Sequence, residues 1–581
     1  MLTRTLIIGI SLTYSAQLSV AAYKDDVRYT ELNTELYLRG AAIPTGDGVN
    51  VTQVEGQWST GAYLADALNS EFTNVTINDQ SGSTDGLTSP HATWVGRNWY
   101  GSATSLSPGI GNVSAYEASS FMNSGWYSGT PPTETNPLQN HSWVSWYDNN
   151  NSTLRMDYAV NRDGFLPIAG LDNSDYPVPL PTRPSEIPDT YGNIYNGITV
   201  GVSDGTHRYG LTTYDGAGRV KPEIVAPGRV PGSNSTSAQY TSYATPMITS
   251  AAALLIESAN GDSDALKPVT LKAILLAGAD KSISVDWDQT DTRPIDDVYG
   301  AGELDIYESY FIQQAGQQAA SSTMDERGWN LSSVSSSSSE TYNINVPAGF
   351  ELRNLSALIT WNRIVTQTVT GPRIKYTPSL ANLSLSLTGS VVSRTSDSDF
   401  DNIEHIWRDS TNALASGNYT MTVASASSTS TAYAIAWRSE LYQDYTLWSS
   451  GTFTVSTLRD PDDDPDGDGI KNLLEQAFGG DPEAQDLDIL PLNETIEDGG
   501  NSYLQISYRK PEFANGLTYT VETVTDLNGT WSRQSSDVEL ISIASESGGF
   551  DRYTYRLVDP ISASDKAFLR VSVSAPISVP E

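Results

Sequence analysis

Ser242 is the side chain of this 581-residue chain whose position best suits nucleophilic chemistry. It stands in Tyr240-Thr-Ser-Tyr-Ala-Thr-Pro246, directly before the strongly apolar run 244–258. That run predicts a buried helix, and the free N–H groups and positive dipole end of its first turn would stabilise a developing oxyanion. The purely structural interpretation is that Ser242 is an ordinary N-cap. As a nucleophile, it needs a base that takes its proton and a group that orients the base.

A second chemical pattern is the acidic segment Asp464-Pro-Asp-Gly-Asp-Gly-Ile-Lys-Asn-Leu-Leu-Glu475. Hard oxygen ligands at this spacing, with Gly469 at the sixth position for the sharp turn, are those of a 12-residue Ca²⁺ loop. The sequence therefore predicts a structural Ca²⁺ site. The alternative is an acidic flexible linker. The ligands that the positions predict are Asp464, Asp466, Asp468, the backbone carbonyl of Ile470, Asn472 and Glu475.

The composition excludes several classes of function. The chain has 33 Lys and Arg residues against 69 Asp and Glu, which gives a net charge of −36. Such a surface repels phosphate backbones and acidic membrane surfaces, so nucleic acid is excluded as a partner. The absence of cysteine excludes a disulfide framework, a cysteine nucleophile and thiolate metal sites.

The first 22 residues have the pattern of a secretory signal peptide. Arg4 gives the positive start, 6–12 is a short apolar core, and small residues lead up to Ala21 and Ala22. No later apolar run reaches the length of a membrane span. We therefore expect a secreted protein, extracellular or periplasmic. An exported chain without cysteine is more typical of bacteria.

The elements that would position Ser242 alternate in type over residues 30–310. Apolar, strand-like runs occur at 49–54, 164–169, 197–202 and 224–226, and helix-like runs at 152–160, 244–258 and 268–279. This alternation predicts an α/β domain with a mostly parallel sheet and flanking helices. Residues 332–339 are rich in serine, which is typical of a linker. Beyond them, period-two patterning with aromatic residues predicts two β-sandwich-like domains.

Two blocks of sequence around Ser242 resemble the subtilisin-like serine peptidases, or subtilases. Lys221-Pro-Glu-Ile-Val-Ala-Pro-Gly228 resembles the family's KPDIVAPG block. After 13 further residues, the segment that holds Ser242 resembles the family's GTSMATPxVAGAAALL block. Segments 48–56, 196–204 and 299–305 resemble other blocks of the family, so the likeness covers about residues 40–310.

The resemblance implies a Ser-His-acid triad. It makes Ser242 the nucleophile, and it makes His91 the base because Pro90-His-Ala-Thr-Trp-Val-Gly96 resembles the family's HGTHVAG block. Glu55 stands where the family usually has the acidic Asp, and a Glu can also hold the imidazole tautomer. Asp47, in the loop before that strand, is the alternative acid, and a solvated carboxylate is the structural alternative for Glu55.

The resemblance also implies an oxyanion donor and a substrate cleft. Asn173 is the best match for the amide that donates to the oxyanion. Ser142 and Trp143 lie in a segment that resembles the family's INxSLG strand, whose edge pairs with the substrate backbone. The alternative for that segment is an aromatic core strand.

These expectations combine into a secreted serine endopeptidase that acts on protein or peptide substrates through an acyl-enzyme. The alternative is a catalytically inactive subtilase fold that acts as an extracellular binding module. Two departures from the family pattern motivate that alternative: Tyr240 replaces a Gly, and Glu55 replaces the Asp.

The domains that follow resemble known accessory modules. The sandwich resembles the jelly-roll domains that follow many subtilase domains, which implies that it stabilises the protease or contacts cell surfaces or glycans. The acidic loop resembles thrombospondin type-3-like calcium segments. We therefore expect a signal peptide (1–22), a peptidase domain (23–325), a Ser-rich linker (326–341), a jelly-roll-like sandwich (342–458), a calcium-binding linker loop (459–483) and a C-terminal β-rich domain (484–581).

Overall fold

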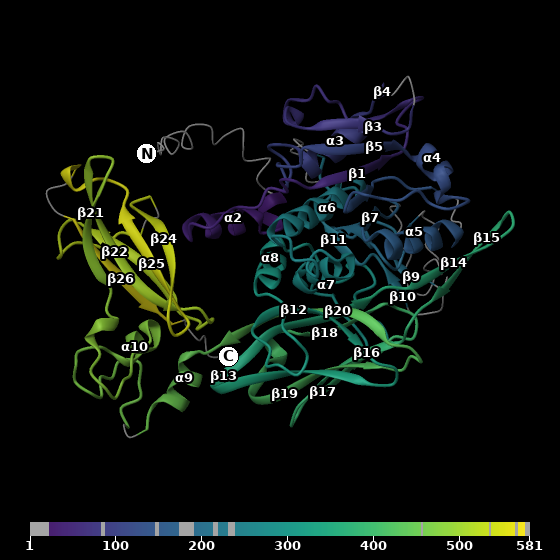
Figure 1. The fold of residues 1–581 in the computed structure, drawn as a ribbon. Helices are drawn as coiled ribbons and strands as arrows, with labels where there is room; N and C mark the ends of the chain where they lie inside the picture. Colours follow the sequence, from purple (N-terminus) through teal and green to yellow (C-terminus); the bar gives the residue numbers. More distant parts are fainter. Residues whose placement is uncertain are drawn as a thin grey trace.

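The computed structural model describes residues 23–82, 87–145, 150–173, 191–212, 219–230, 239–454, 457–533, 536–563 and 567–575. The predicted signal peptide therefore lies outside the described residues. Figure 1 shows an α/β domain, a β domain below it and a second β domain to one side. Within the described residues, no helix has the length and apolar character needed to span a membrane.

A seven-stranded sheet forms the centre of the first domain, with the order β11-β8-β7-β6-β1-β5-β3 and every neighbouring pair parallel. Strands β7, β8 and β11 are buried along their whole length, which is why they are continuous apolar runs in the sequence. The strands are β1 (Asn50–Glu55), β3 (Thr76–Asp79), β5 (Asn112–Glu117), β6 (Leu138–His141), β7 (Leu166–Gly170), β8 (Ile198–Val202) and β11 (Ile224–Ala226).

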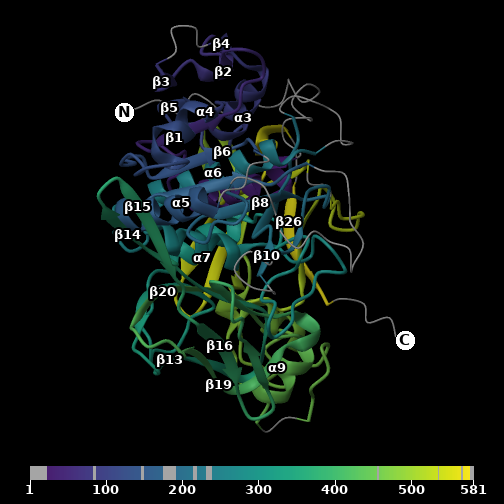
Figure 2. The same cartoon turned by 90° about the vertical axis from the view of Figure 1, so that its right-hand side faces the viewer.

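Helices cover both faces of this sheet (Figures 1 and 2). One face packs against α3 (Pro90–Tyr100), α6 (Thr241–Ser258), α7 (Pro268–Gly278) and α8 (Ile306–Gln314). The other face packs against α4 (Ala118–Phe121) and α5 (Asn150–Asp163). The smaller elements are α2 (Tyr29–Leu38), β2 (Ala62–Leu64), β4 (Leu87–Thr88), β9 (Gly210–Thr212), β10 (Arg219–Lys221) and the single turns 70–72 and 122–126.

Helix α6 meets the carboxyl ends of the central strands. It begins at Thr241, so Ser242 lies in its first turn. A Cβ on Gly170, the last residue of β7, would lie 2.6 Å from Oγ1 of Thr245. The missing side chain at Gly170 therefore lets the first turns of α6 approach the strand end closely. This close approach brings Ser242 to the edge of the sheet where β1 and β6 also end.

An antiparallel sheet forms the second domain, with the order β12-β20-β13-β19-β16-β17 and with β18 also paired to β13. Its strands are β12 (Arg327–Val334), β13 (Ser339–Trp361), β16 (Leu383–Thr388), β17 (Ser393–Ser396), β18 (Ile403–Arg408), β19 (Leu414–Ser425) and β20 (Thr431–Tyr442). Strands β14 (Ile364–Thr370) and β15 (Arg373–Ser379) form a separate hairpin that reaches back toward α5 (Figure 1).

The expected Ser-rich linker at 326–341 is not a linker in the structure. Residues 327–334 form β12, which pairs with β20, and 335–338 make the turn into β13. Buried Trp329 and Val334 anchor this strand on the apolar core. The serines hid the strand because they occupy its exposed positions and the turn that follows.

The second domain is joined to the first through buried polar contacts. The Arg363 guanidinium pairs with the Asp157 carboxylate of α5 at 2.6 Å, and both side chains are buried. Lys281 donates from Nζ to Oγ of Ser356 on β13 at 3.0 Å. Through these contacts the sandwich packs directly against the α/β domain.

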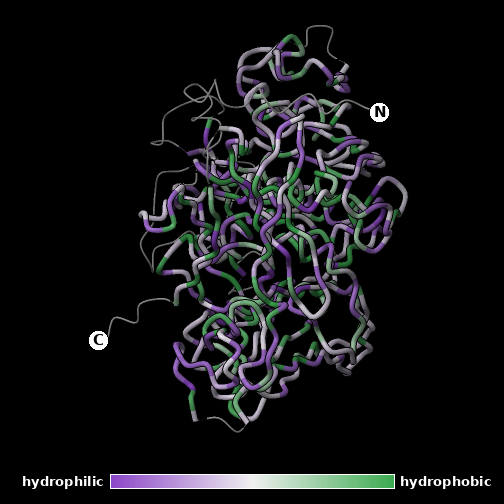
Figure 3. The backbone as a smooth tube through the Cα atoms, turned by 90° about the vertical axis from the view of Figure 1, so that its left-hand side faces the viewer, coloured by the Kyte–Doolittle hydropathy of each residue, from purple (hydrophilic) through white to green (hydrophobic). Residues whose placement is uncertain are grey.

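The last domain contains a four-stranded sheet, β21-β22-β25-β24, and a two-stranded sheet, β23-β26. Arg39, which follows α2, pairs with Asp551 of this domain at 2.6 Å. Hydrophobic and hydrophilic stretches alternate at short intervals along the backbone (Figure 3). The elements after β20 are α9 (Tyr445–Thr452), α10 (Asn472–Phe478), β21 (Leu492–Asp498), β22 (Asn501–Pro511), β23 (Thr518–Val524), β24 (Val538–Glu546), β25 (Phe550–Leu557) and β26 (Phe568–Ser574), with single turns at 487–489 and 561–563. The single turn 410–412 lies in the second domain, between β18 and β19.

Candidate active site

Glu55 and His91 form a hydrogen-bonded pair at the edge of the parallel sheet. Glu55 is the last residue of β1, and His91 lies in the first turn of α3, where Ser89 caps the helix. Oε2 of Glu55 lies 2.9 Å from Nδ1 of His91. The Glu55 side chain is 2% exposed and the His91 side chain 21%. The acid is therefore shielded while the imidazole still reaches solvent.

The pair fixes the tautomer that a general base needs. A carboxylate can only accept, so Nδ1 of His91 donates its proton to Glu55 and Nε2 keeps the lone pair when the ring is neutral. Burial by itself would lower the pKa of His91. The charge and the hydrogen bond of Glu55 outweigh burial, and the pKa is raised above its usual 6.5. The alternative acid, Asp47, is exposed in the turn before β1.

The two other histidines of this domain have structural partners. Burial lowers the pKa of His141 to about 3 and that of His207 to about 4. His207 accepts a hydrogen bond from the Val202 N–H and contacts the Val298 carbonyl through its other nitrogen. Of the three, only His91 is oriented by a carboxylate.

Gln53 orients the Glu55 carboxylate, and Tyr100 in turn holds Gln53. Neither residue was predicted from the sequence. Gln53 donates from Nε2 to Oε1 of Glu55 at 3.0 Å and to the Ala92 carbonyl at 3.2 Å. The Tyr100 hydroxyl donates to Oε1 of Gln53 at 2.7 Å. Gln53 lies two residues before Glu55, on the same face of β1. The sequence feature that could have indicated Gln53 is a polar residue two positions before Glu55 in a buried strand.

Ser242 lies in the first turn of α6, next to a residue whose ring lies near His91. The adjacent Tyr243 ring lies 5.8 Å from the His91 ring. The Ser242 hydroxyl donates to the Ser142 carbonyl at 3.3 Å. Among the described residues, no hydrogen bond joins Ser242 to His91. Catalytic hydrogen bonds of free enzymes are often long and tighten only with bound substrate.

Asn173 contacts the same helix turn from the end of β7. Its Oδ1 accepts from the Thr241 N–H at 2.7 Å and from the Thr241 hydroxyl at 3.0 Å. Because Oδ1 is held in this way, the Nδ2 amide is the group left to donate to an oxyanion. The N–H groups of Tyr243 and Ala244 bond to the Tyr240 carbonyl, whereas the Ser242 N–H has no acceptor within the helix.

The replacement of a glycine by Tyr240 does not strain the backbone. Tyr240 is extended, with φ −139° and ψ 135°, and its N–H bonds to the Gly228 carbonyl at 2.8 Å. The close approach is taken up by Gly228, where a Cβ would lie 2.5 Å from the Tyr240 carbonyl oxygen. The glycine requirement therefore falls on Gly228.

The predicted cleft residues come directly after β6, at the edge of the sheet where β1 also ends. Asn140 of β6 donates from Nδ2 to Oγ of Ser142 at 2.8 Å and so holds the segment that follows this strand. Trp143 lines a cavity of about 740 Å³. Gly56, the residue after Glu55, lines the same cavity. The Trp58 ring, which belongs to a residue that is 59% exposed, stacks on the His91 ring with ring centres 6.4 Å apart.

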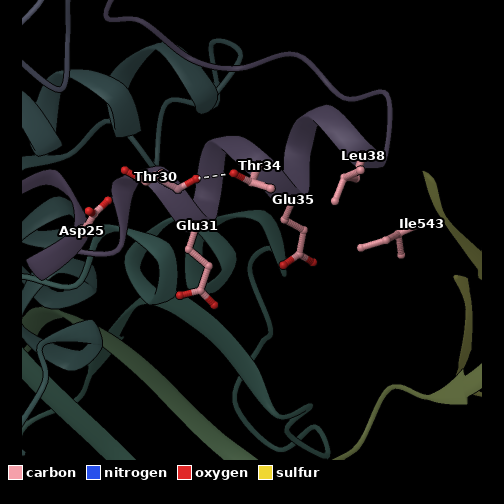
Figure 4. Close-up of a pocket in the computed structure, with 7 residues that line it drawn as sticks. All are labelled: Asp25, Thr30, Glu31, Thr34, Glu35, Leu38 and Ile543. Carbon is pink, nitrogen blue, oxygen red and sulfur yellow. Dashed lines mark hydrogen bonds between the residues drawn. The ribbon is translucent and has the colours of Figure 1, made fainter. Parts of the chain in front are cut away.

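A separate acidic cavity of about 470 Å³ lies between α2 and β24 (Figure 4). Its carboxylates are partly used: Arg28 pairs with Glu31, and Arg39 pairs with Glu35. The cavity contains no histidine, and the catalytic candidates do not line it.

The predicted calcium loop brings carboxylates together, although not all of its predicted ligands. Two groups of close carboxylate oxygens share Asp468: one with Asp464 and Asp466, the other with Glu475 and Asp486. Burial and the carboxylates of Asp486 and Asp468 raise the pKa of Glu475 to about 8. Sequence analysis missed Asp486 because it lies outside the 12-residue pattern.

The two remaining predicted ligands lie outside these carboxylate groups. The Asn472 Nδ2 donates to the carbonyls of Leu458 and Asp460, at 3.3 Å and 2.8 Å, and its Oδ1 is buried without a partner among the described residues. The Ile470 side chain packs in the core of the last domain, and its N–H bonds to Asp468, which leaves its carbonyl as the predicted ligand. Buried oxygens without partners and an all-oxygen donor set fit a hard cation such as Ca²⁺.

Comparison with known proteins agrees with the α/β part of this description. Residues 101–302 match the family model for peptidase S8, the subtilase family. The match includes Ser142, Asn173 and Ser242, and it leaves out Glu55 and His91. It supports a subtilisin-like serine peptidase domain, which antiparallel β domains follow.

Solved structures give weaker likenesses. The prenylagaramide maturation protease PagA is 16% identical, with a TM-score of 0.33 over 49% of this chain and 98% of its own. A mutant of the protease domain of PatA is 15% identical, with a TM-score of 0.31 over 47% and 98%. PliG of Salmonella Typhimurium, a periplasmic inhibitor of g-type lysozyme, is 13% identical, with a TM-score of 0.12 over 20% and 94%. No curated protein matches the chain.

Proposed function

We propose that this protein is a serine endopeptidase that cleaves peptide bonds with Ser242, His91 and Glu55. The observation that carries the proposal is the 2.9 Å hydrogen bond from His91 to Glu55, together with a serine in the first turn of α6 whose neighbour Tyr243 has its ring 5.8 Å from the His91 ring. A base held by a carboxylate, next to a serine and free helix amides, is the arrangement that acyl transfer requires. Substrates would be proteins or peptides.

In the proposed reaction, the Ser242 hydroxyl attacks the peptide carbonyl while Nε2 of His91 takes the hydroxyl proton. The developing oxyanion accepts hydrogen bonds from the Ser242 N–H and the Asn173 amide. His91 then gives its proton to the leaving amine, and the C–N bond breaks to leave an acyl ester on Ser242. Water, deprotonated by His91, hydrolyses that ester and restores the serine. Glu55 stays ionised and stabilises the imidazolium that forms in each step.

The cleft geometry supports substrate binding along the segment that follows β6. The extended segment after β6 carries Trp143 in the wall of the cavity near Glu55. A peptide that places its carbonyl at Ser242 would lie next to this segment. Trp58 and Tyr243, whose rings lie near the His91 ring, would also contact the substrate.

An inactive binding module is the second candidate function. One observation favours it: the Ser242 hydroxyl donates to the Ser142 carbonyl, which directs its proton away from His91. A module of this kind would bind peptides in the same cleft without turnover.

Peptide-library cleavage followed by mass spectrometry separates the two candidates. We expect new termini with the wild-type protein and none with His91→Ala. Binding of library peptides without any new terminus in the wild type would favour the inactive module.

Export and the role of the later domains also belong to this proposal. We infer a secreted bacterial protein from the N-terminal pattern of Arg4 and the apolar run 6–12. We infer that the β domains stabilise the peptidase domain or contact cell surfaces or glycans. The buried Arg363–Asp157 pair supports the first of these roles.

A further inference from the structure

The strongest unexplained feature outside the active site is Glu475, a buried carboxylate without a partner. It lies in α10, and the residue is 1% exposed. Neither Oε1 nor Oε2 has a hydrogen-bond partner among the described residues. An isolated buried carboxylate is costly in free energy, so such a group is normally paired or bound to a metal ion.

The groups nearest to Glu475 are also carboxylates. One oxygen each of Asp468, Glu475 and Asp486 lie within 4.8 Å of one another. Oδ1 of Asp486 and Oδ2 of Asp466 are buried and have no partner among the described residues either. Acceptors that face one another without a donor need a cation or shared protons between them. Lys471, the cation of this segment, pairs instead with Asp462.

We propose that one Ca²⁺ ion is held by Asp468, Glu475 and Asp486, with Asp466 at its edge. The new ligand is Asp486, which lies 11 residues beyond the end of the predicted loop. Asp464 is not in the group of close oxygens around Glu475, and its two oxygens accept the N–H groups of Gly467 and Gly469 and shape the turn. Four carboxylates favour Ca²⁺ over Mg²⁺, because Mg²⁺ keeps several waters and uses one or two carboxylates.

This ion would tie α10 to the segment that enters the last domain. The Asp486 N–H donates to Oδ2 of Asp468 at 3.2 Å, and Ile489, three residues later, lies in the core of the last domain. Helix α10 is held from the other side, since Tyr519 donates to the Ala477 carbonyl at 2.8 Å. Gln476 donates to the Gln443 carbonyl at the end of the sandwich. The ion therefore stabilises the junction between the sandwich and the last domain (Figure 1).

Calcium titration of the full-length, chelator-treated protein tests this site. We expect one Ca²⁺ per chain by calorimetry, a rise of the melting temperature with Ca²⁺, and a smaller rise with Mg²⁺ at the same concentration. Asp486→Asn and Glu475→Gln should each weaken Ca²⁺ binding at least tenfold and remove most of the thermal shift.

Asp488→Asn is the matched control, because Asp488 is exposed and lies outside the carboxylate group. It should bind Ca²⁺ like the wild type. Far-ultraviolet circular dichroism shows whether a variant is folded. If Glu475→Gln fails to fold, Asp486→Asn and Gly480→Ala remain. A Cβ on Gly480 would lie 1.5 Å from Oε2 of Glu475 and displace that carboxylate.

Two results would overturn the proposal. Wild-type protein that binds no Ca²⁺ would mean that the cluster holds shared protons. Full Ca²⁺ affinity in Asp486→Asn would place the ion in the loop 464–475 alone.

Discussion

Nδ1 of His91 donates a hydrogen bond to a Glu55 carboxylate that is 2% exposed, at 2.9 Å. The Glu side chain is one methylene longer than that of the Asp usual in Ser-His-acid triads. Glu55 nevertheless lies at the end of β1 in a position from which its carboxylate accepts the hydrogen bond from the His91 imidazole. Gln53 holds the other oxygen of the carboxylate. The pair therefore has the geometry of an acid that orients a base.

Glu55→Gln should lower kcat by roughly 10³–10⁴-fold, because an amide no longer stabilises the imidazolium and can favour the wrong tautomer. Asp47→Asn, which changes the alternative acid, should keep the wild-type rate. Initial rates on a cleaved library peptide measure both. Equal losses in the two variants would remove Glu55 from its assigned role.

Activity should fall as the pH drops, with an acid limb in kcat/KM centred above pH 6.5. The raised pKa of His91 means that its imidazole takes up a proton already at a pH above the ordinary value, and the protonated ring cannot act as a base. Glu55→Gln should move this limb to lower pH, since the charge that raises the pKa is gone. A limb at the same pH in both proteins would contradict the assignment.

Gln53→Leu should lower kcat roughly tenfold with little change in KM. The substitution frees one oxygen of Glu55 and leaves the Tyr100 hydroxyl without its acceptor. Tyr100→Phe keeps the bond from Gln53 to Glu55 and should have a smaller effect. The acid limb of the pH profile should also move in Gln53→Leu, which a loss of stability alone would not cause.

Asn173→Ala should cost about 10²–10³-fold in kcat, the loss found when one such oxyanion donor is removed from subtilisin. KM should change little, because this donor acts mainly on the charge that develops in the transition state. Thermal unfolding should accompany the kinetics, since Oδ1 of Asn173 also caps the Thr241 N–H. A rise in KM with an unchanged kcat would show that Asn173 only binds substrate.

The sequence predicted the parts of this site that depend on local pattern. Strand β1 and the apolar helix α6 follow from the pattern of apolar residues, and the blocks around His91 and Ser242 follow from resemblance. Helix α3 (Pro90–Tyr100), which carries His91, was not predicted. Gln53 was not predicted, because its role depends on where the Glu55 side chain points in three dimensions. Asp486 was not predicted for a similar reason: it lies outside the 12-residue loop pattern, and only the fold brings it close to Glu475. Strand β12, which is followed by a run of serines, was mistaken for part of a linker, because its pairing with β20 is not visible in composition.

Labelling by a fluorophosphonate probe is the most direct test of Ser242 as an activated nucleophile. The probe reacts with a serine that a base deprotonates, so the wild-type protein should be labelled at Ser242, and Ser242→Ala should not be labelled. Ser102→Ala, which changes an exposed serine of the same domain, should label like the wild type. Labelling that persists in Ser242→Ala, or a wild-type protein that is never labelled, would contradict the account.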